Sequence, residues 1–168
     1  MIARVAGQIA AAGLDPCIVV TGHEADAVRA ALAETNITLA HNSDYAQGLS
    51  GSLRTGLQAL PKNVDGVLVC LGDMPDVRAA HLQKLIAAFD PVEGRAICVP
   101  TFQGKRGNPV LFGAQFFVEM MMVAGDTGAK HLIGEHGDLV CEVEMDDAAI
   151  LLDLDTPQAM SDYQRLKG

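Results

Sequence analysis

The chain has 168 residues, of which 49% are hydrophobic and only 4% aromatic, and its formal net charge is −9. This length predicts a single domain, residues 1–168, whose core is built mainly from Ala, Val, Leu and Ile. The negative charge argues against nucleic acids and anionic membranes as partners, because both attract basic surfaces. No apolar run approaches the roughly 18 residues of a membrane span. The four cysteines form no CxxC pair, which is typical of buried free thiols in a reducing cytoplasm.

Predicted helices and strands alternate along the first half of the chain. Apolar residues at helical spacing predict helices, and short apolar runs bounded by turn residues predict strands. The predicted helices cover residues 2–13, 24–32, 52–60, 78–89, 114–123 and 125–134, with a last helix beginning near Pro157. The predicted strands cover residues 17–21, 37–40, 67–71, 96–100, 110–112, 139–144 and 150–154. This alternation predicts an α/β fold with a mostly parallel sheet, to which the short later strands could add an antiparallel element.

The first candidate for chemistry follows the apolar strand at residues 67–71. Gly72 and Asp73 come directly after it, and Pro75 ends any further strand pairing. Ligands of open α/β sheets bind beyond the carboxyl ends of the strands, and a carboxylate there can hold Mg²⁺ against a phosphate. The alternative interpretation is that Asp73 caps the following helix or closes an Asx turn.

Asp153 and Asp155 form the second candidate. Residues two apart on a strand face the same side of a sheet, so the predicted strand at 150–154 brings the two carboxylates together. Carboxylates in such a pair repel each other unless a cation or a donor lies between them. Together with Asp73 they would form an oxygen-rich Mg²⁺ site, although Asp155 could also cap the last helix beside Thr156.

Three loops rich in small or basic residues are further candidates. Gly48-Leu49-Ser50-Gly51-Ser52 precedes a predicted helix, where exposed N–H groups and hydroxyls suit a phosphate or a base, or where a serine caps the helix. Residues 104–109 carry Lys105 and Arg106, which can meet a phosphate or remain solvated. Gly125-Asp126-Thr127-Gly128 is either part of a site or a capped helix start.

The order of these stretches resembles a known family. Six stretches follow one another as they do in the molybdenum cofactor nucleotidyltransferases, most closely in the molybdopterin cytidylyltransferase branch. They are Thr21-Gly22-His23, residues 48–56, Leu71-Gly72-Asp73-Met74-Pro75, residues 106–109, residues 125–129 and residues 153–157. The resemblance covers nearly all 168 residues. It implies a Rossmann-like nucleotidyltransferase fold, a three-layer α/β/α sandwich.

The resemblance also implies a reaction and roles for residues. The reaction would transfer CMP from CTP to the phosphate of molybdopterin, release pyrophosphate and need Mg²⁺. Asp73 would hold Mg²⁺, with Asp153 or Asp155 as the second ligand, and Asp73 and Asp155 would be the catalytic carboxylates. The nucleotide would lie along Gly48, Leu49, Ser50, Ser52, Gly72 and Asp73. The acceptor would face Arg106, Gly107, Asn108 and Pro109 together with Gly125, Asp126 and Gly128.

Two departures from the family pattern carry expectations. Family members typically have histidine at the position of Asn108, and they begin with a strand and a glycine-rich triphosphate loop that this chain lacks. Since that strand is central in the family's sheet, its neighbours are expected to lack a partner, and the activity of this chain to be impaired. A segment of a second subunit could fill that place, and a molybdoenzyme is a further expected partner. The alternatives are a guanylyltransferase or another NTP transferase of the same fold, and a non-catalytic partner module.

Overall fold

The computed structural model describes residues 1–126, 128–154, 156, 158, 161, 163 and 165. The helices are α1 (Ile2–Ala11), α2 (Ala25–Ala31), α3 (Leu49–Gln58), α4 (Ala79–Ala88), α5 (Phe117–Met122) and α6 (Lys130–Glu135). The strands are β1 (Ile18–Thr21), β2 (Thr38–His41), β3 (Gly66–Val69), β4 (Ile97–Phe102), β5 (Lys105–Arg106), β6 (Val110–Gly113) and β7 (Val140–Glu144). Short 3-10 turns are η1 (Tyr45–Gln47), η2 (Ala114–Phe116), η3 (Gly137–Leu139) and η4 (Ala148–Leu151).

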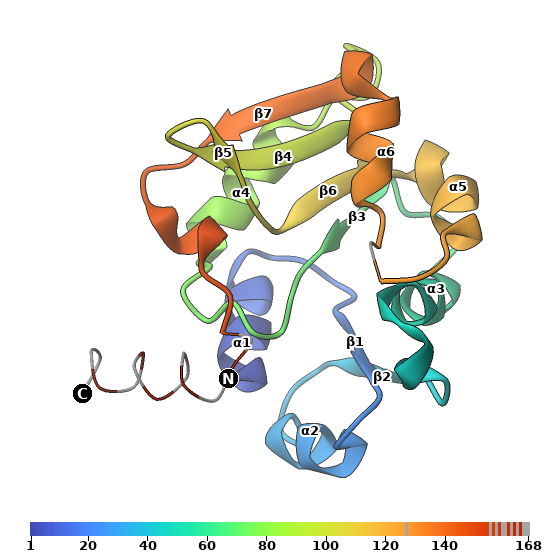
Figure 1. Cartoon of the computed structure of the whole chain (residues 1–168), viewed down its shortest axis with the longest axis vertical. Coiled ribbons are helices and arrows are strands. Elements are labelled where there is room, and N and C mark those ends of the chain that lie inside the picture. The colour runs from blue at the N-terminus through green and yellow to red at the C-terminus, as the bar shows by residue number, and fades with distance from the viewer. Residues whose placement is uncertain are drawn as a thin grey trace.

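The described strands form two separate sheets (Figure 1). β1 and β2 pair in parallel as a two-stranded sheet. The other sheet has the order β3-β6-β4-β5, with β7 parallel to β4 and the remaining pairs antiparallel. β1 and β3 thus lie in different sheets. The α/β class is confirmed, although antiparallel pairs are more numerous than the predicted mostly parallel sheet implies.

The larger sheet is covered by helices on both faces. On one face, side chains of β4 and β6 pack against Phe116, Met120, Leu132 and Ile133 from η2, α5 and α6. On the other face, Cys98 and Leu111 pack against Leu85 of α4 and Ile150 of η4. The alternation of residues along β4 and β6 therefore fills two core layers, because successive side chains of a strand point to opposite faces.

Three predicted segments differ from the structure. Residues 150–154 were predicted as a strand, which is wrong: residues 148–151 form η4, and residues 152–154 have no regular secondary structure. The predicted loop at 45–51 contains η1 and the first turn of α3. The predicted loop at 104–109 begins with the short strand β5, which pairs with the end of β4. Pro157, near which the last helix was predicted to begin, lies outside the described residues.

No helix among the described residues is long and apolar enough to cross a lipid bilayer. The thiols of Cys17, Cys70, Cys98 and Cys141 are all free. Burial raises the pKa of Cys98 to about 12, with a smaller contribution from the neighbouring thiol of Cys141 on β7. Cys98 is fully buried and packs in the core, so it is a core residue without a role in the site.

Candidate active site

Asp73 lies just beyond the end of β3, in the turn that connects this strand to α4. It is partly buried. The backbone N–H of Leu154 donates to the Asp73 carbonyl oxygen over 3.1 Å. This hydrogen bond brings two segments about 80 residues apart into contact at the carboxyl end of β3, where ligands of α/β sheets bind.

Asp153 therefore lies one residue from a direct contact with Asp73. Its side chain is exposed to solvent, whereas the neighbouring Leu154 is buried. Asp153 was predicted to lie on a strand and to share one face of it with Asp155; this is wrong, because residues 150–154 form no strand. Asp155 itself lies outside the described residues, so its predicted roles as catalytic residue and metal ligand stay predictions.

The loop that contains Arg106 and Asn108 lies beside the same segment. The backbone N–H of Asn108 donates to the carbonyl oxygen of Ile150 over 2.9 Å. A Cβ atom on Gly107 would overlap that same carbonyl group, so only glycine lets the two chains approach this closely. Residues 106–109 and 150–154 therefore form one packed unit beside β3, to which β6 is paired.

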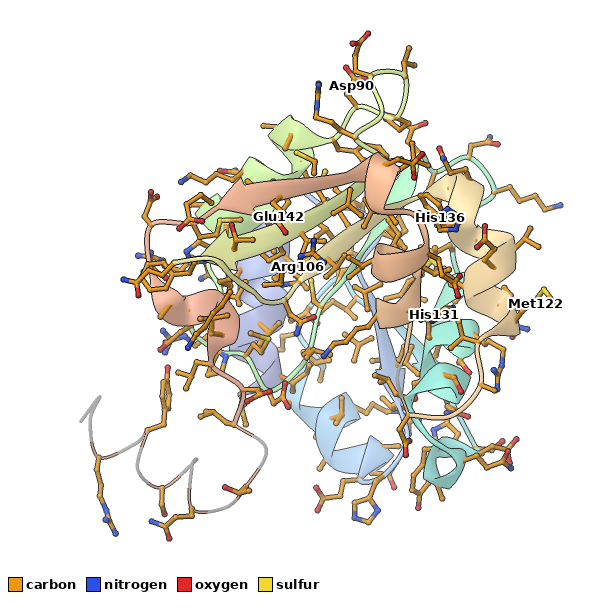
Figure 2. All side chains as sticks on the ribbon, turned by 45° about the horizontal axis from the view of Figure 1, so that its top comes forward. Asp90, Arg106, Met122, His131, His136 and Glu142 are labelled. Carbon is orange, nitrogen blue, oxygen red and sulfur yellow. The ribbon has the colours of Figure 1, made fainter. Side chains whose placement is uncertain are left out.

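The positive charge of Arg106 has a partner in the structure. Its Nε donates to Oε1 of Glu142 over 2.6 Å, and both side chains are about half exposed. Arg106 belongs to β5 and Glu142 to β7, two strands that both pair with β4, and the two residues lie close to each other (Figure 2). Because an exposed ion pair contributes little to stability, this guanidinium can exchange Glu142 for a phosphate at small cost.

A hydrogen-bonded network holds η4 in place. Asp147 accepts from the Ala149 N–H over 3.0 Å, forms an ion pair with Arg78, and lies 3.4 Å from Nε2 of the buried His81 at the start of α4. The Ala149 hydrogen bond is the main cause that lowers the pKa of Asp147, with further contributions from His81 and Arg78 and an opposing one from burial. The network ties the segment leading to Asp153 to the helix that follows Asp73.

The stretch 48–52 forms the first turn of α3 and meets the loop at 125–128. The Ser50 N–H donates to the Gly125 carbonyl over 3.1 Å. Gly48 has a φ of 109° and a ψ of 173°, and a Cβ atom there would overlap Oδ1 of Asp126. The structure thus brings together one stretch predicted to bind the nucleotide and one predicted to bind the acceptor.

Individual side chains in this turn differ in what they can contact. Ser50 is only 2% exposed, so it can hold the turn in shape rather than touch a ligand. Ser52 is partly buried and Leu49 exposed. Gly128 packs closely on Leu49, while Asp126 and Gly125 are exposed and open to a ligand. Thr127 lies outside the described residues.

Asn42 is a positioning residue that the sequence did not single out for this role. Its side chain is buried, accepts from the Asp44 N–H over 3.0 Å and donates to Ser52 Oγ over 3.2 Å. It links the end of β2 to the first turn of α3. The preceding His41 forms a 3.1 Å hydrogen bond with Thr21 at the end of β1. The position of two polar residues, His41 and Asn42, at the end of a predicted strand was the feature of the sequence that could have indicated this role.

The arrangement provides two kinds of ligand-binding chemistry. The hydrogen bond between Leu154 and Asp73 brings together two segments that each carry a carboxylate, Asp73 and Asp153, and carboxylate oxygens are the ligands that Mg²⁺ prefers. The first turn of the ten-residue helix α3 is a region of positive electrostatic potential, which favours phosphate or carboxylate groups. A site with both features can bind a nucleoside triphosphate and its metal ion.

Comparison with known families agrees with this arrangement. Residues 1–140 match the model of the MobA-like NTP transferase domain. The chain is 29% identical over 143 residues to the molybdenum cofactor cytidylyltransferase of Escherichia coli K12, covering 83% of this chain and 69% of that protein. It is also 29% identical over 118 residues to the purine catabolism protein PucB of Bacillus subtilis, but spans only 55% of that protein's length.

Solved structures show the same fold. A nucleotidyl transferase from Methanothermobacter thermautotroptrophicus superimposes with a TM-score of 0.81 at 27% identity, covering 98% of this chain and 77% of that one. Rv0371c from Mycobacterium tuberculosis, in complex with manganese, superimposes with a TM-score of 0.76 at 28% identity, covering 98% of this chain and 84% of that one. The chain is therefore a nucleotidyltransferase and belongs to the family of MobA-like NTP transferase domains.

Proposed function

We propose that this chain transfers CMP from CTP to the phosphate of a molybdopterin-type acceptor and releases pyrophosphate. The observation that carries the choice of CTP and of this acceptor is the 29% identity to a molybdenum cofactor cytidylyltransferase over 83% of the chain. The free thiols suit the reducing environment of the cytoplasm as the place of the reaction.

Mg²⁺ is the proposed metal, and the donor set fits it. Asp73 and Asp153 offer hard oxygen ligands from two segments that are hydrogen-bonded to each other, and Asp155 is the alternative second ligand. A bound Mg²⁺ would neutralise the charge of the triphosphate and of the pyrophosphate that leaves. The related Rv0371c was solved with manganese, a divalent ion that also favours oxygen ligands.

The protein's own residues would supply binding and orientation. The nucleotide is proposed to contact Gly48, Leu49 and Ser52 in the first turn of α3. Gly72, beside Asp73, is a further proposed contact, and Ser50 is proposed to hold the turn in shape. Asp126 and Gly125 are proposed to contact the acceptor, together with Asn108 and with Arg106 once it is released from Glu142. Phosphoryl transfer of this kind depends mostly on positioning and charge neutralisation, so no covalent intermediate is required.

A turnover assay tests this function. Pyrophosphate release is measured with Mg²⁺, molybdopterin and either CTP or GTP. The proposal expects release with CTP that stops when the acceptor is omitted. Preference for GTP would show a guanylyltransferase with the same site.

The absence of both turnover and nucleotide-dependent stabilisation would support a non-catalytic module. The divided sheet favours this second candidate, because β1 and β3 lie in different sheets. Turnover that appears only when a second subunit or a molybdoenzyme is added would instead show that a partner completes the site.

A further inference from the structure

We propose that Glu119, Glu135 and His136 form a binding site for a divalent transition-metal ion, of which Zn²⁺ is the first candidate. Each residue offers one ligand atom, and these three atoms lie within 4.8 Å of one another. Glu119 comes from α5, Glu135 is the last residue of α6, and His136 follows it. The site is separate from the proposed nucleotide site and does not depend on the proposed function.

The imidazole is held in position by the protein core. The ring of His136 packs against the ring of Phe116, with centroids 4.9 Å apart, and Phe116 is only 2% exposed. The backbone N–H of His136 donates to the Leu132 carbonyl over 2.9 Å. His136 therefore presents its Nε2 to Glu119 from a fixed place, at a distance of 2.8 Å from Oε2, and Figure 2 shows His136 in this position at the end of α6.

The two carboxylates can close on an ion without disturbing the fold. The side chains of Glu119 and His136 are 45% and 28% exposed, and Glu135 is exposed as well. In a tetrahedral zinc site the ligand atoms lie about 3.4 Å apart, since each is about 2.1 Å from the metal. Rotation of the exposed glutamate side chains can shorten the present distances of up to 4.8 Å to this value. A water molecule would occupy the open fourth position.

The donor set selects a class of metal. One imidazole nitrogen with two carboxylate oxygens suits Zn²⁺, Co²⁺ or Ni²⁺ better than Mg²⁺ or Ca²⁺, which prefer oxygen ligands alone. The two negative charges beside the imidazole, in a chain with a net charge of −9, also favour a cation over an anion. The site therefore differs in chemistry from the all-oxygen group at Asp73 and Asp153.

A bound ion would join the two helices that flank the loop at residues 123–129. In that loop the Gly125 carbonyl accepts the hydrogen bond from Ser50 in the first turn of α3. Linking Glu119 to His136 would stabilise the folded state, since an ion that binds only the folded protein raises its stability.

Calorimetric titration of the full chain with Zn²⁺ alone, without nucleotide, tests the site. The proposal expects binding that weakens about tenfold or more in His136→Gln and in Glu119→Gln. The matched control is His131→Gln, an exposed histidine on the same helix (Figure 2), which should bind as the wild type does. Because all variants carry the same cysteines, binding by thiols cancels in the comparison.

Two outcomes overturn the site. One is wild-type binding no tighter than about 1 mM. The other is equal Zn²⁺ affinity of the wild type and both ligand variants. Circular dichroism of the metal-free proteins checks that each variant folds. If His136→Gln does not fold, Glu135→Gln, at an exposed position, replaces it as a ligand variant. Since no nucleotide is present, failure here leaves the proposed transferase reaction unaffected.

Discussion

The backbone N–H of Leu154 donates to the carbonyl oxygen of Asp73 over 3.1 Å. This hydrogen bond joins the end of β3 to a segment near the other end of the described chain. Asp153, whose side chain is exposed, therefore directly precedes a residue that contacts the turn carrying Asp73.

Replacing Gly48 by alanine should destabilise the first turn of α3. Its φ of 109° and ψ of 173° fall in a region that only glycine adopts readily, and strain of this kind costs about 1–3 kcal/mol. The new Cβ would also overlap Asp126. The free energy of unfolding, measured in urea, should fall by at least this amount.

The matched control for Gly48→Ala is Gly94→Ala. Gly94 also has a positive φ, of 76°, but open space where a Cβ would lie. The control should therefore lose only the stability that corresponds to the backbone strain. It should keep the affinity for CTP that Gly48→Ala is expected to lose. Equal losses of stability in the two variants would contradict the proposed close contact with Asp126.

Asn42→Ala should disturb the same turn from the other side. The change removes the partly buried hydrogen bonds of Asn42 to Ser52 and to the Asp44 N–H, and each such bond contributes about 0.5–1.5 kcal/mol. The control is Asn36→Ala, at an exposed position before β2, which should change the unfolding free energy by less than about 0.5 kcal/mol. A comparable loss in both variants would show that Asn42 has no special role.

The pH dependence of stability should include a contribution from Asp147. Because its pKa is lowered in the folded state, the charged form stabilises the protein above its ordinary pKa of about 4, and this contribution is lost as the pH falls through the lower folded value. Asp147→Asn, which keeps an acceptor for Ala149, should be less stable than the wild type at pH 7. The difference should shrink as the pH is lowered below about 4.

Asp147→Ala separates the cap from the charge. It also removes the acceptor for the Ala149 N–H and should cost about 1 kcal/mol more than Asp147→Asn. Unfolding in urea at several pH values measures both effects. A difference between the wild type and Asp147→Asn that stays constant down to pH 3 would contradict a role of the charge.

Glu142→Gln should leave Arg106 available to the acceptor. Since the exposed pair contributes about 0–1 kcal/mol, the loss of stability should be small, and the KM for the acceptor should fall. Arg106→Gln should raise that KM, and Lys105→Gln, the neighbouring exposed cation, should change it less. A KM that is unchanged in Arg106→Gln would remove Arg106 from the proposed acceptor site.

The sequence predicted most helices and strands because their apolar runs are long or clearly periodic. It failed at residues 150–154, where a short apolar run is compatible with either a strand or a helical turn. There the Asp147 side chain accepts a hydrogen bond from the Ala149 N–H and stabilises the helical turn η4. It missed β5 because Lys105 and Arg106 have no apolar pattern and pair with β4 only through the turn at Gln103 and Gly104.

The parts of the site were predicted better than their arrangement. The turn after the apolar run at residues 67–71 identified Asp73, since ligands of α/β sheets bind beyond the carboxyl ends of the strands, whereas Asn42 was not singled out. The contacts of Ser50 with Gly125 and of Asn108 with Ile150 join residues far apart in the chain. Local propensities contain no information on such pairs, so only the folded structure reveals them.

Thermal unfolding of the wild type, Asp73→Asn and Asp65→Asn with CTP and Mg²⁺ decides whether Asp73 contributes to nucleotide binding. Asp65 is an exposed carboxylate at the opposite end of β3 and serves as the control. At a CTP concentration of 100 times the Kd, binding stabilises a protein by about 2.7 kcal/mol, which for this size raises the Tm by about 5–10 °C. The account predicts this rise for the wild type and Asp65→Asn and its loss in Asp73→Asn; a full rise in a folded Asp73→Asn variant would contradict it.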